Sequence, residues 1–267
     1  AYYHYLLSLQ AVREHQFEKA SENLRKLVQF DPNNSEFHRQ LVINLIRAGE
    51  MEDAYNTLNK SIDLFPGNPE LSMMMGDILT GRNEFEQALS YYQRVIQTNS
   101  GLARAYLLSG AIYEIRQQYN LAEDAYKMVI QVEPMNPLGH YYLARMNILA
   151  GKLEDAQKLL SQALELRPNL LQAREFLAWI LEVQGKSDEA KKQYEIILKL
   201  DPLHESAHKR MSTIQGLTLP MDLDSDKYRI DAKQILGDPD VHLKIGTVYY
   251  EQQIYLKALD EFQLLQQ

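Results

Sequence analysis

Residues 103–136, ARAYLLSGAIYEIRQQYNLAEDAYKMVIQVEPMN, contain the pattern that decides the fold of this chain. Ala122 stands near the middle, Gly110 lies twelve residues before it, and Pro134 lies twelve residues after it. Between these positions apolar side chains recur every three or four residues, as they do on the buried stripe of an amphipathic helix. Because proline cannot continue a helix, Pro134 marks the end of a second helix. The stretch therefore predicts two helices joined by a turn.

The same pattern recurs along the chain with a period of 34 residues. The alanine is repeated in register at Ala20, Ala54, Ala88, Ala122, Ala156, Ala190 and Ala258. The proline recurs at Pro32, Pro66, Pro134, Pro168 and Pro202. The position twelve residues before the alanine is mostly small, with Val42 as the exception: Ser8, Gly76, Gly110, Ala144, Ala178, Ser212 and Gly246. A fixed period of this length indicates stacked helix pairs, so we expect eight repeats, each with two helices of roughly 12–14 residues.

The spacing of small, aromatic, alanine and proline residues resembles the tetratricopeptide repeat, most clearly at Tyr106, Gly110, Tyr113, Ala122, Tyr126 and Pro134. The resemblance covers seven of the eight repeats and extends to uncharacterised bacterial proteins with long arrays. It implies an all-α, right-handed superhelical α-solenoid. In that fold the first helices of the repeats line a concave groove and the second helices form the convex back.

One continuous solenoid is expected, with six regular repeats over residues 1–204. The seventh repeat, 205–238, is degenerate: Asp224 replaces the alanine, and Pro220 falls in an irregular loop at 216–224. We expect its first helix at about 204–216. The eighth repeat, 239–267, is truncated.

The composition limits the classes of partner. A formal net charge of −8 argues against nucleic acid, and the lack of an 18-residue apolar run argues against direct membrane insertion. The absence of cysteine excludes disulfides and thiolate metal sites and favours a bacterial source. The compartment is left open between bacterial cytoplasm and periplasm, with a lean to the cell envelope.

Both ends of the chain suggest a fragment of a longer protein, since it starts without methionine and ends inside an expected helix. Phe262 and Leu265 would face a missing neighbour. We therefore expect self-association through the truncated C-terminal repeat.

His204, Glu205 and His208 match the H-E-x-x-H pattern of zinc peptidases. In those enzymes both histidines lie on a formed helix, whereas His204 follows Pro202 so closely that we expect it to precede the helix. A zinc hydrolase built on these three residues is a remote alternative. The stretch 222–226 resembles a calcium loop but has Lys227 where glycine belongs, so we expect a solvated loop there.

Most histidines share one position of the repeat, the fourth: His4, His38, His140, His208 and His242. A ladder of histidines for metal binding or pH sensing is one reading. Packing against the next repeat is the interpretation we favour, so we expect no metal and no cofactor.

The resemblance also places the ligand-facing residues, at the second, fifth, ninth, twelfth and thirteenth positions of each repeat. By position, we expect a partner to contact Tyr5, Leu9, Arg13, Arg39, Ile43, Arg47, Met73, Asp77, Arg104, Leu107, Tyr141, Arg145 and Trp179. Aromatic and arginine residues are enriched at binding hot spots, and Trp179 should be partly exposed if it lines a groove.

These observations predict a non-catalytic scaffold that binds a peptide or helical segment of a partner protein, of unknown identity, in its concave groove. Similar bacterial arrays serve envelope, pilus or polysaccharide-export assembly. The alternative is a structural spacer module in a larger enzyme or exporter.

Overall fold

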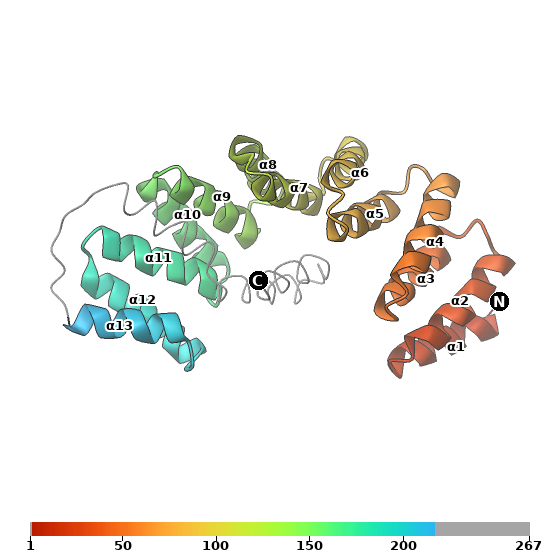
Figure 1. Ribbon diagram of the computed structural model, residues 1–267, viewed down its shortest axis with the longest axis horizontal. Coiled ribbons are helices and arrows are strands. Elements are labelled where there is room, and N and C mark those ends of the chain that lie inside the picture. Colours follow the sequence, from red (N-terminus) through yellow and green to blue (C-terminus); the bar gives the residue numbers. More distant parts are fainter. Residues whose placement is uncertain (1, 217–267) are drawn as a thin grey trace. The chain divides into compact units, whose positions relative to one another are not determined.

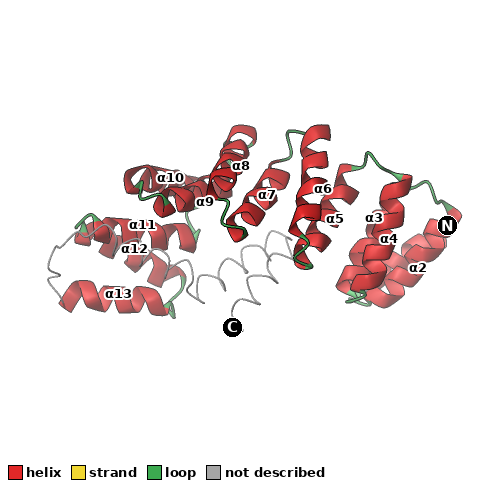
Figure 2. Ribbon diagram, turned by 45° about the horizontal axis from the view of Figure 1, so that its top comes forward, coloured by secondary structure: helices red, strands yellow, loops and turns green. Residues whose placement is uncertain are grey.

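The structure of the protein is a computed structural model, and it describes residues 2–216. Within these residues every regular element is a helix (Figures 1 and 2). The first helices of the repeats are α1 (Tyr2–Arg13), α3 (Ser35–Arg47), α5 (Pro69–Gly81), α7 (Ala103–Ile115), α9 (Pro137–Leu149), α11 (Leu171–Val183) and α13 (Glu205–Gly216). The second helices are α2 (Phe17–Phe30), α4 (Met51–Leu64), α6 (Phe85–Thr98), α8 (Tyr119–Val132), α10 (Leu153–Leu166) and α12 (Ser187–Leu200).

The all-α fold of paired helices is as predicted, and α13 matches the helix expected at about 204–216. The loop at 216–224 and the eighth repeat, with Phe262, Leu265 and His242, lie outside the described residues. The described chain forms two compact units: an N-terminal unit up to Ala105 and a C-terminal unit from Tyr106 onward. None of the helices in residues 2–216 is long and apolar enough to cross a bilayer.

The helices of a repeat approach closely at the predicted small residues. All six described alanines of the series are fully buried: Ala20, Ala54, Ala88, Ala122, Ala156 and Ala190. A Cβ added to Gly110 would lie 2.6 Å from Cε1 of Tyr126, and one added to Gly76 would lie 2.8 Å from Cδ1 and Cζ of Tyr92. The glycine thus leaves room for a tyrosine ring of the second helix. In the repeat with Val42, Leu58 replaces the tyrosine, and both side chains are fully buried.

The turn inside each repeat has a residue in the left-handed backbone conformation. It is the fifteenth residue of the repeat each time, at His15, Gly49, Asn83, Gln117, Gly151 and Gly185. The next backbone N–H reaches back to the end of the first helix, as from Glu50 to the carbonyl of Leu45 at 2.9 Å. This is the Schellman arrangement, which satisfies the last carbonyls of a helix. Because the second helix starts directly afterwards, the turn sets the direction in which it leaves.

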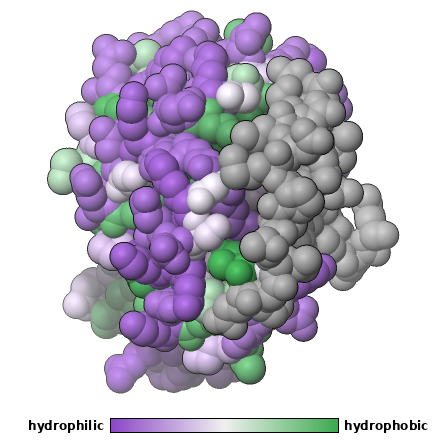
Figure 3. Space-filling view, turned by 90° about the vertical axis from the view of Figure 1, so that its left-hand side faces the viewer, coloured by the Kyte–Doolittle hydropathy of each residue, from purple (hydrophilic) through white to green (hydrophobic). Residues whose placement is uncertain are grey.

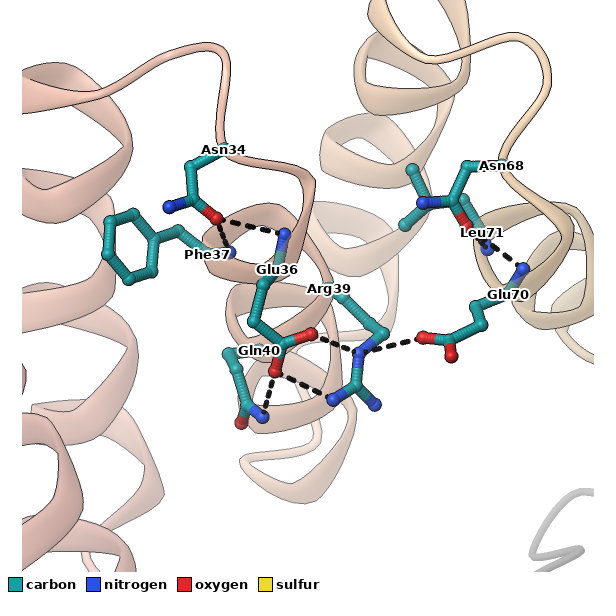
Figure 4. A network of polar contacts seen from close by, with 8 residues as sticks. All are labelled: Asn34, Glu36, Phe37, Arg39, Gln40, Asn68, Glu70 and Leu71. Atoms are coloured by element: carbon teal, nitrogen blue, oxygen red, sulfur yellow. Dashed lines mark hydrogen bonds and ion pairs between the residues drawn. The ribbon is translucent and has the colours of Figure 1, made fainter.

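The joints between repeats are capped by asparagine. The side-chain oxygen of Asn34 accepts the N–H of Glu36, and that of Asn68 accepts the N–H of Glu70 (Figure 4). Asn136 caps α9 in the same way. Such caps satisfy N–H groups that have no partner within the helix.

Replacing Gly76 with alanine tests the close approach. Alanine normally stabilises a helix interior relative to glycine by about 1 kcal/mol, but here its Cβ would meet the Tyr92 ring. We expect Gly76→Ala to destabilise the protein by about 1–3 kcal/mol, measured by urea unfolding followed by circular dichroism. Gly67→Ala is the matched control, since nothing lies within 4 Å of its added Cβ. An unfolding midpoint for Gly76→Ala at or above that of the parent would disprove the constraint.

Candidate partner-binding face

The first helix of the N-terminal unit, α1, exposes large apolar side chains. On α1, Tyr5 is 37% exposed and Leu9 is 49% exposed. They lie one turn apart, and Arg13 follows after another turn. The ring of Tyr5 lies 6.2 Å from that of Phe37 on α3, so the two first helices are neighbours. We call the surface formed by Tyr5, Leu9, Arg13, Ile43 and Arg47 the α1–α3 face.

Arg39, predicted to contact a partner, is already bound by two carboxylates (Figure 4). Its Nε and Nη2 each donate to Glu36 at 2.7 Å, and Nε lies 3.0 Å from Glu70 of the next repeat. The hydrogen bonds between Arg39 and Glu36 lower the pKa of Glu36 and raise that of Arg39. The glutamates are more than half exposed, so the cluster contributes little to stability, but it neutralises the guanidinium.

Two further predicted contacts, Asp77 and Arg104, pair with each other. Their side chains are 2.6 Å apart, and the Tyr92 hydroxyl donates to Asp77 at 2.9 Å. Burial, and then the charge of Asp77, raise the pKa of Tyr92 well above its usual value, so the hydroxyl remains a donor. Asp77 therefore connects the second helix of its own repeat to the first helix of the next.

The same link of tyrosine, carboxylate and arginine recurs in the C-terminal unit. The Tyr126 hydroxyl donates to Glu114 at 2.5 Å, and Glu114 lies 3.1 Å from Arg145. Burial lowers the pKa of Arg145. Glu114 and the nearby tyrosines raise it by more, so the pKa lies well above its usual value. The guanidinium also stands over the ring of Tyr142, 5.3 Å from its centroid.

A third link joins Tyr194, Glu182 and Arg210, with 3.4 Å between Glu182 and Arg210. Burial raises the pKa of Glu182, while the Tyr194 hydrogen bond and Arg210 oppose that rise. The sequence held a signal for these links: a tyrosine four residues after the alanine, an acidic residue at the ninth or twelfth position, and an arginine in the next repeat. The sequence-based prediction assigned Arg104 and Arg145 to ligand contacts, so it missed these links.

The expectation that Trp179 is partly exposed is wrong, since only 5% of it is accessible. Met73, Leu107 and Tyr141 are also buried. Their helices α5, α7, α9 and α11 carry apolar residues around most of their circumference, and a helix of that kind is buried on more than one side.

On the face drawn in Figure 3, hydrophilic residues predominate and hydrophobic ones are scattered.

The histidines at the fourth position close the turns between repeats. Nε2 of His38, His140 and His208 lies 2.9–3.0 Å from the carbonyl oxygen of the proline six residues earlier. A carbonyl only accepts, so Nε2 carries the proton. Arg174, at the same position of another repeat, donates to the carbonyl of Pro168. His38 also packs edge-on against Phe65. Phe65 belongs to the same repeat as His38, so the predicted packing against the next repeat is wrong for this histidine: its ring contacts its own repeat and the turn that precedes it.

His204 precedes α13, as expected, and acts as its N-terminal cap. Its Nδ1 accepts the N–H of Ala207 at 3.2 Å, and its Nε2 lies 3.1 Å from Glu175. His208 is engaged with Pro202, so a zinc ion at this motif would have to displace contacts of both imidazoles. Within residues 2–216, no group of three or more His, Cys, Asp or Glu side chains is arranged to hold a metal ion.

Two family models, both described as tetratricopeptide repeat, match the chain. One matches residues 11–78 and 147–212, and the other matches 73–137 and 116–170. A search of curated proteins found no significant match.

Three solved structures illustrate the similarity of fold. PilW, described as a widely conserved type IV pilus biogenesis factor, is 19% identical over 79% of this chain and 96% of its own, with a TM-score of 0.63. PilF of Pseudomonas aeruginosa is 16% identical over 85% of this chain and 97% of its own, with a TM-score of 0.59. YrrB, described as having an unusual peptide-binding site, is 13% identical over 72% of this chain and all of its own, with a TM-score of 0.57.

Glu114→Gln tests the recurring link. It would leave the charge of Arg145, whose side chain is 12% exposed, without its carboxylate. We expect a loss of about 3–5 kcal/mol, as when a buried ion pair loses one partner, in urea unfolding followed by Trp179 fluorescence. Glu123→Gln removes the pair with Lys127, whose side chain is 53% exposed, and should cost less than about 0.5 kcal/mol. Equal effects of the two substitutions would contradict the link.

The burial of Trp179 gives a separate prediction. Acrylamide should quench its fluorescence poorly, and Trp179→Ala should destabilise the protein by about 3–5 kcal/mol because it leaves a cavity. Efficient quenching together with unchanged stability would place the ring at the surface after all.

Proposed function

The chain belongs to the tetratricopeptide repeat family, and on that premise we propose that it is a non-catalytic scaffold that binds a peptide or helical segment of a partner protein. The proposed binding surface is the α1–α3 face. In this proposal the first helices of the array bind the partner protein, and the second helices pack against the opposite side of the first helices.

The observation that carries this proposal is the exposure of large apolar side chains on α1. Tyr5 and Leu9 are exposed one turn apart, next to α3. Apolar residues at the equivalent sites of later repeats, such as Met73 and Leu107, are buried. An exposed apolar stripe flanked by arginine suits a helix or an extended peptide with apolar anchors, and tyrosine and arginine are frequent anchors of interfaces.

The similarity to PilW and PilF supports a bacterial envelope or pilus assembly as the process that the partner belongs to. We propose a bacterial protein, with the envelope preferred over the cytoplasm as its location. YrrB, which has a similar fold, is described as having a peptide-binding site, and this supports a peptide as the class of ligand.

Site-specific photo-crosslinking in bacterial cells tests the proposal. A photoreactive amino acid in place of Leu9 should trap a defined protein species, whereas one in place of Lys26 on the exposed side of α2 should not. Tyr5→Ala combined with Leu9→Ala should weaken binding of the trapped protein by about 30-fold or more, as expected for a hot spot of 2 kcal/mol.

Trapping from Lys26 alone would move the binding surface to the second helices. A full-length protein that functions normally with both alanine substitutions, and yields no species from Leu9, would favour the spacer module instead. Circular dichroism of each variant checks that the helices remain folded.

A further inference from the structure

We infer that the partner segment carries acidic residues at one end: a stretch with apolar side chains that lie on Tyr5 and Leu9, flanked on one side by carboxylates that Arg13 and Arg47 bind. The inference rests on the proposed function and adds the chemistry of the ligand. All five residues of the α1–α3 face belong to the N-terminal unit.

The five arginines predicted to contact a ligand divide into two groups. Arg39, Arg104 and Arg145 each have a carboxylate of the array within 3.1 Å. Arg13 and Arg47 are exposed, and neither has a carboxylate within ion-pair distance in residues 2–216. A ligand carboxylate therefore competes with no protein carboxylate at these two positions.

The nearest acidic residues in the sequence are engaged elsewhere. Glu14 accepts a hydrogen bond from Gln10 at 2.9 Å, and Glu50 pairs with Arg25 at 3.0 Å. Arg47 lies over the ring of Phe17, with its guanidinium carbon 5.7 Å from the centroid. An aromatic face orients a guanidinium and leaves its charge available to an anion.

The two arginines occupy equivalent places in adjacent repeats. Arg13 is the last residue of α1, and Arg47 is the last residue of α3. Phe17 begins α2, directly after the turn that follows Arg13, so its contact with Arg47 brings that guanidinium to the same turn. Leu9 precedes Arg13 by one helical turn, and Ile43 precedes Arg47 by one turn. The α1–α3 face is thus apolar along its length and basic at one end.

This basic end is particular to the first two repeats. The equivalent thirteenth positions of the next four repeats hold Gly81, Ile115, Leu149 and Val183. If the fold required a cation at this position, the later repeats would also have a basic residue there. Charge complementarity therefore selects an acidic group at the end of an apolar segment, where a planar guanidinium binds a carboxylate with two parallel hydrogen bonds.

A phage-displayed library of random peptides of about twelve residues, long enough to span such a face, tests the inference on the whole chain. The parent should enrich peptides in which apolar residues are flanked on one side by Asp or Glu. Arg13→Gln combined with Arg47→Gln should lose the acidic preference. The matched control is Arg94→Gln, an exposed arginine on α6 that stands over Tyr91 with its guanidinium carbon 5.4 Å from the ring centroid, and it should behave as the parent.

A synthetic peptide from the selected set then gives the magnitude by fluorescence anisotropy. The double variant should bind it about tenfold or more weakly, as should the parent with the acidic residues of the peptide changed to amides. Rising ionic strength should weaken the parent complex and affect the double variant little.

Apolar peptides enriched without acidic residues, and bound equally by the double variant, would overturn the inference and leave the proposed function intact. No enrichment, or enrichment that ignores Tyr5→Ala with Leu9→Ala, would overturn both. Self-association in sedimentation that the double variant abolishes would assign the face to a second copy of the chain and contradict the inference.

Discussion

The close contact between the two helices of a repeat is the constraint on which the rest of the structure depends. The buried alanine series and the small residues at the eighth position leave space, and in two repeats a tyrosine ring fills the space over glycine. Interiors are packed too tightly for a methyl group to be added without cost. The size at one position therefore limits the size at the other. Glycine or alanine accompanies a tyrosine, at Gly76 with Tyr92, Gly110 with Tyr126 and Ala178 with Tyr194, whereas Val42 accompanies Leu58.

The packing of the tyrosines has an electrostatic consequence. Because the ring of Tyr92 lies against the first helix, its hydroxyl reaches Asp77 on that helix, and Asp77 in turn binds Arg104 of the following repeat. Tyr126, Glu114 and Arg145 repeat the arrangement. A steric fit inside one repeat is thereby connected to an ion pair between neighbouring repeats, which matches the way in which such arrays gain stability from nearest-neighbour contacts.

Ion pairs within the array decide which arginines remain available to a partner. An arginine that is paired with a carboxylate of the array can bind another anion only after that ion pair is broken. Breaking a buried ion pair costs free energy. In the first two repeats there is no tyrosine at the corresponding position of the second helix, since Leu24 and Leu58 stand there. No link of that kind forms among these residues, and Arg13 and Arg47 stay exposed next to the apolar side chains of α1. As a result, the α1–α3 face is apolar along its length and basic at one end.

The sequence alone determined the class of fold, the helix pairs and their register, because a period of 34 residues with alanine, proline and small residues at set places reports local geometry and close packing directly. It also predicted that His204 precedes its helix, since Pro202 ends the one before. The exposure of the chosen site residues was decided only by tertiary structure. The position of a residue within a repeat determines the direction in which its side chain points. It does not determine whether a neighbouring helix covers that side chain, as for Trp179, or whether a carboxylate from an adjacent repeat pairs with it, as for Arg39, Arg104 and Arg145. Burial and pairing depend on residues about one repeat away in the sequence that become neighbours only when the helices stack.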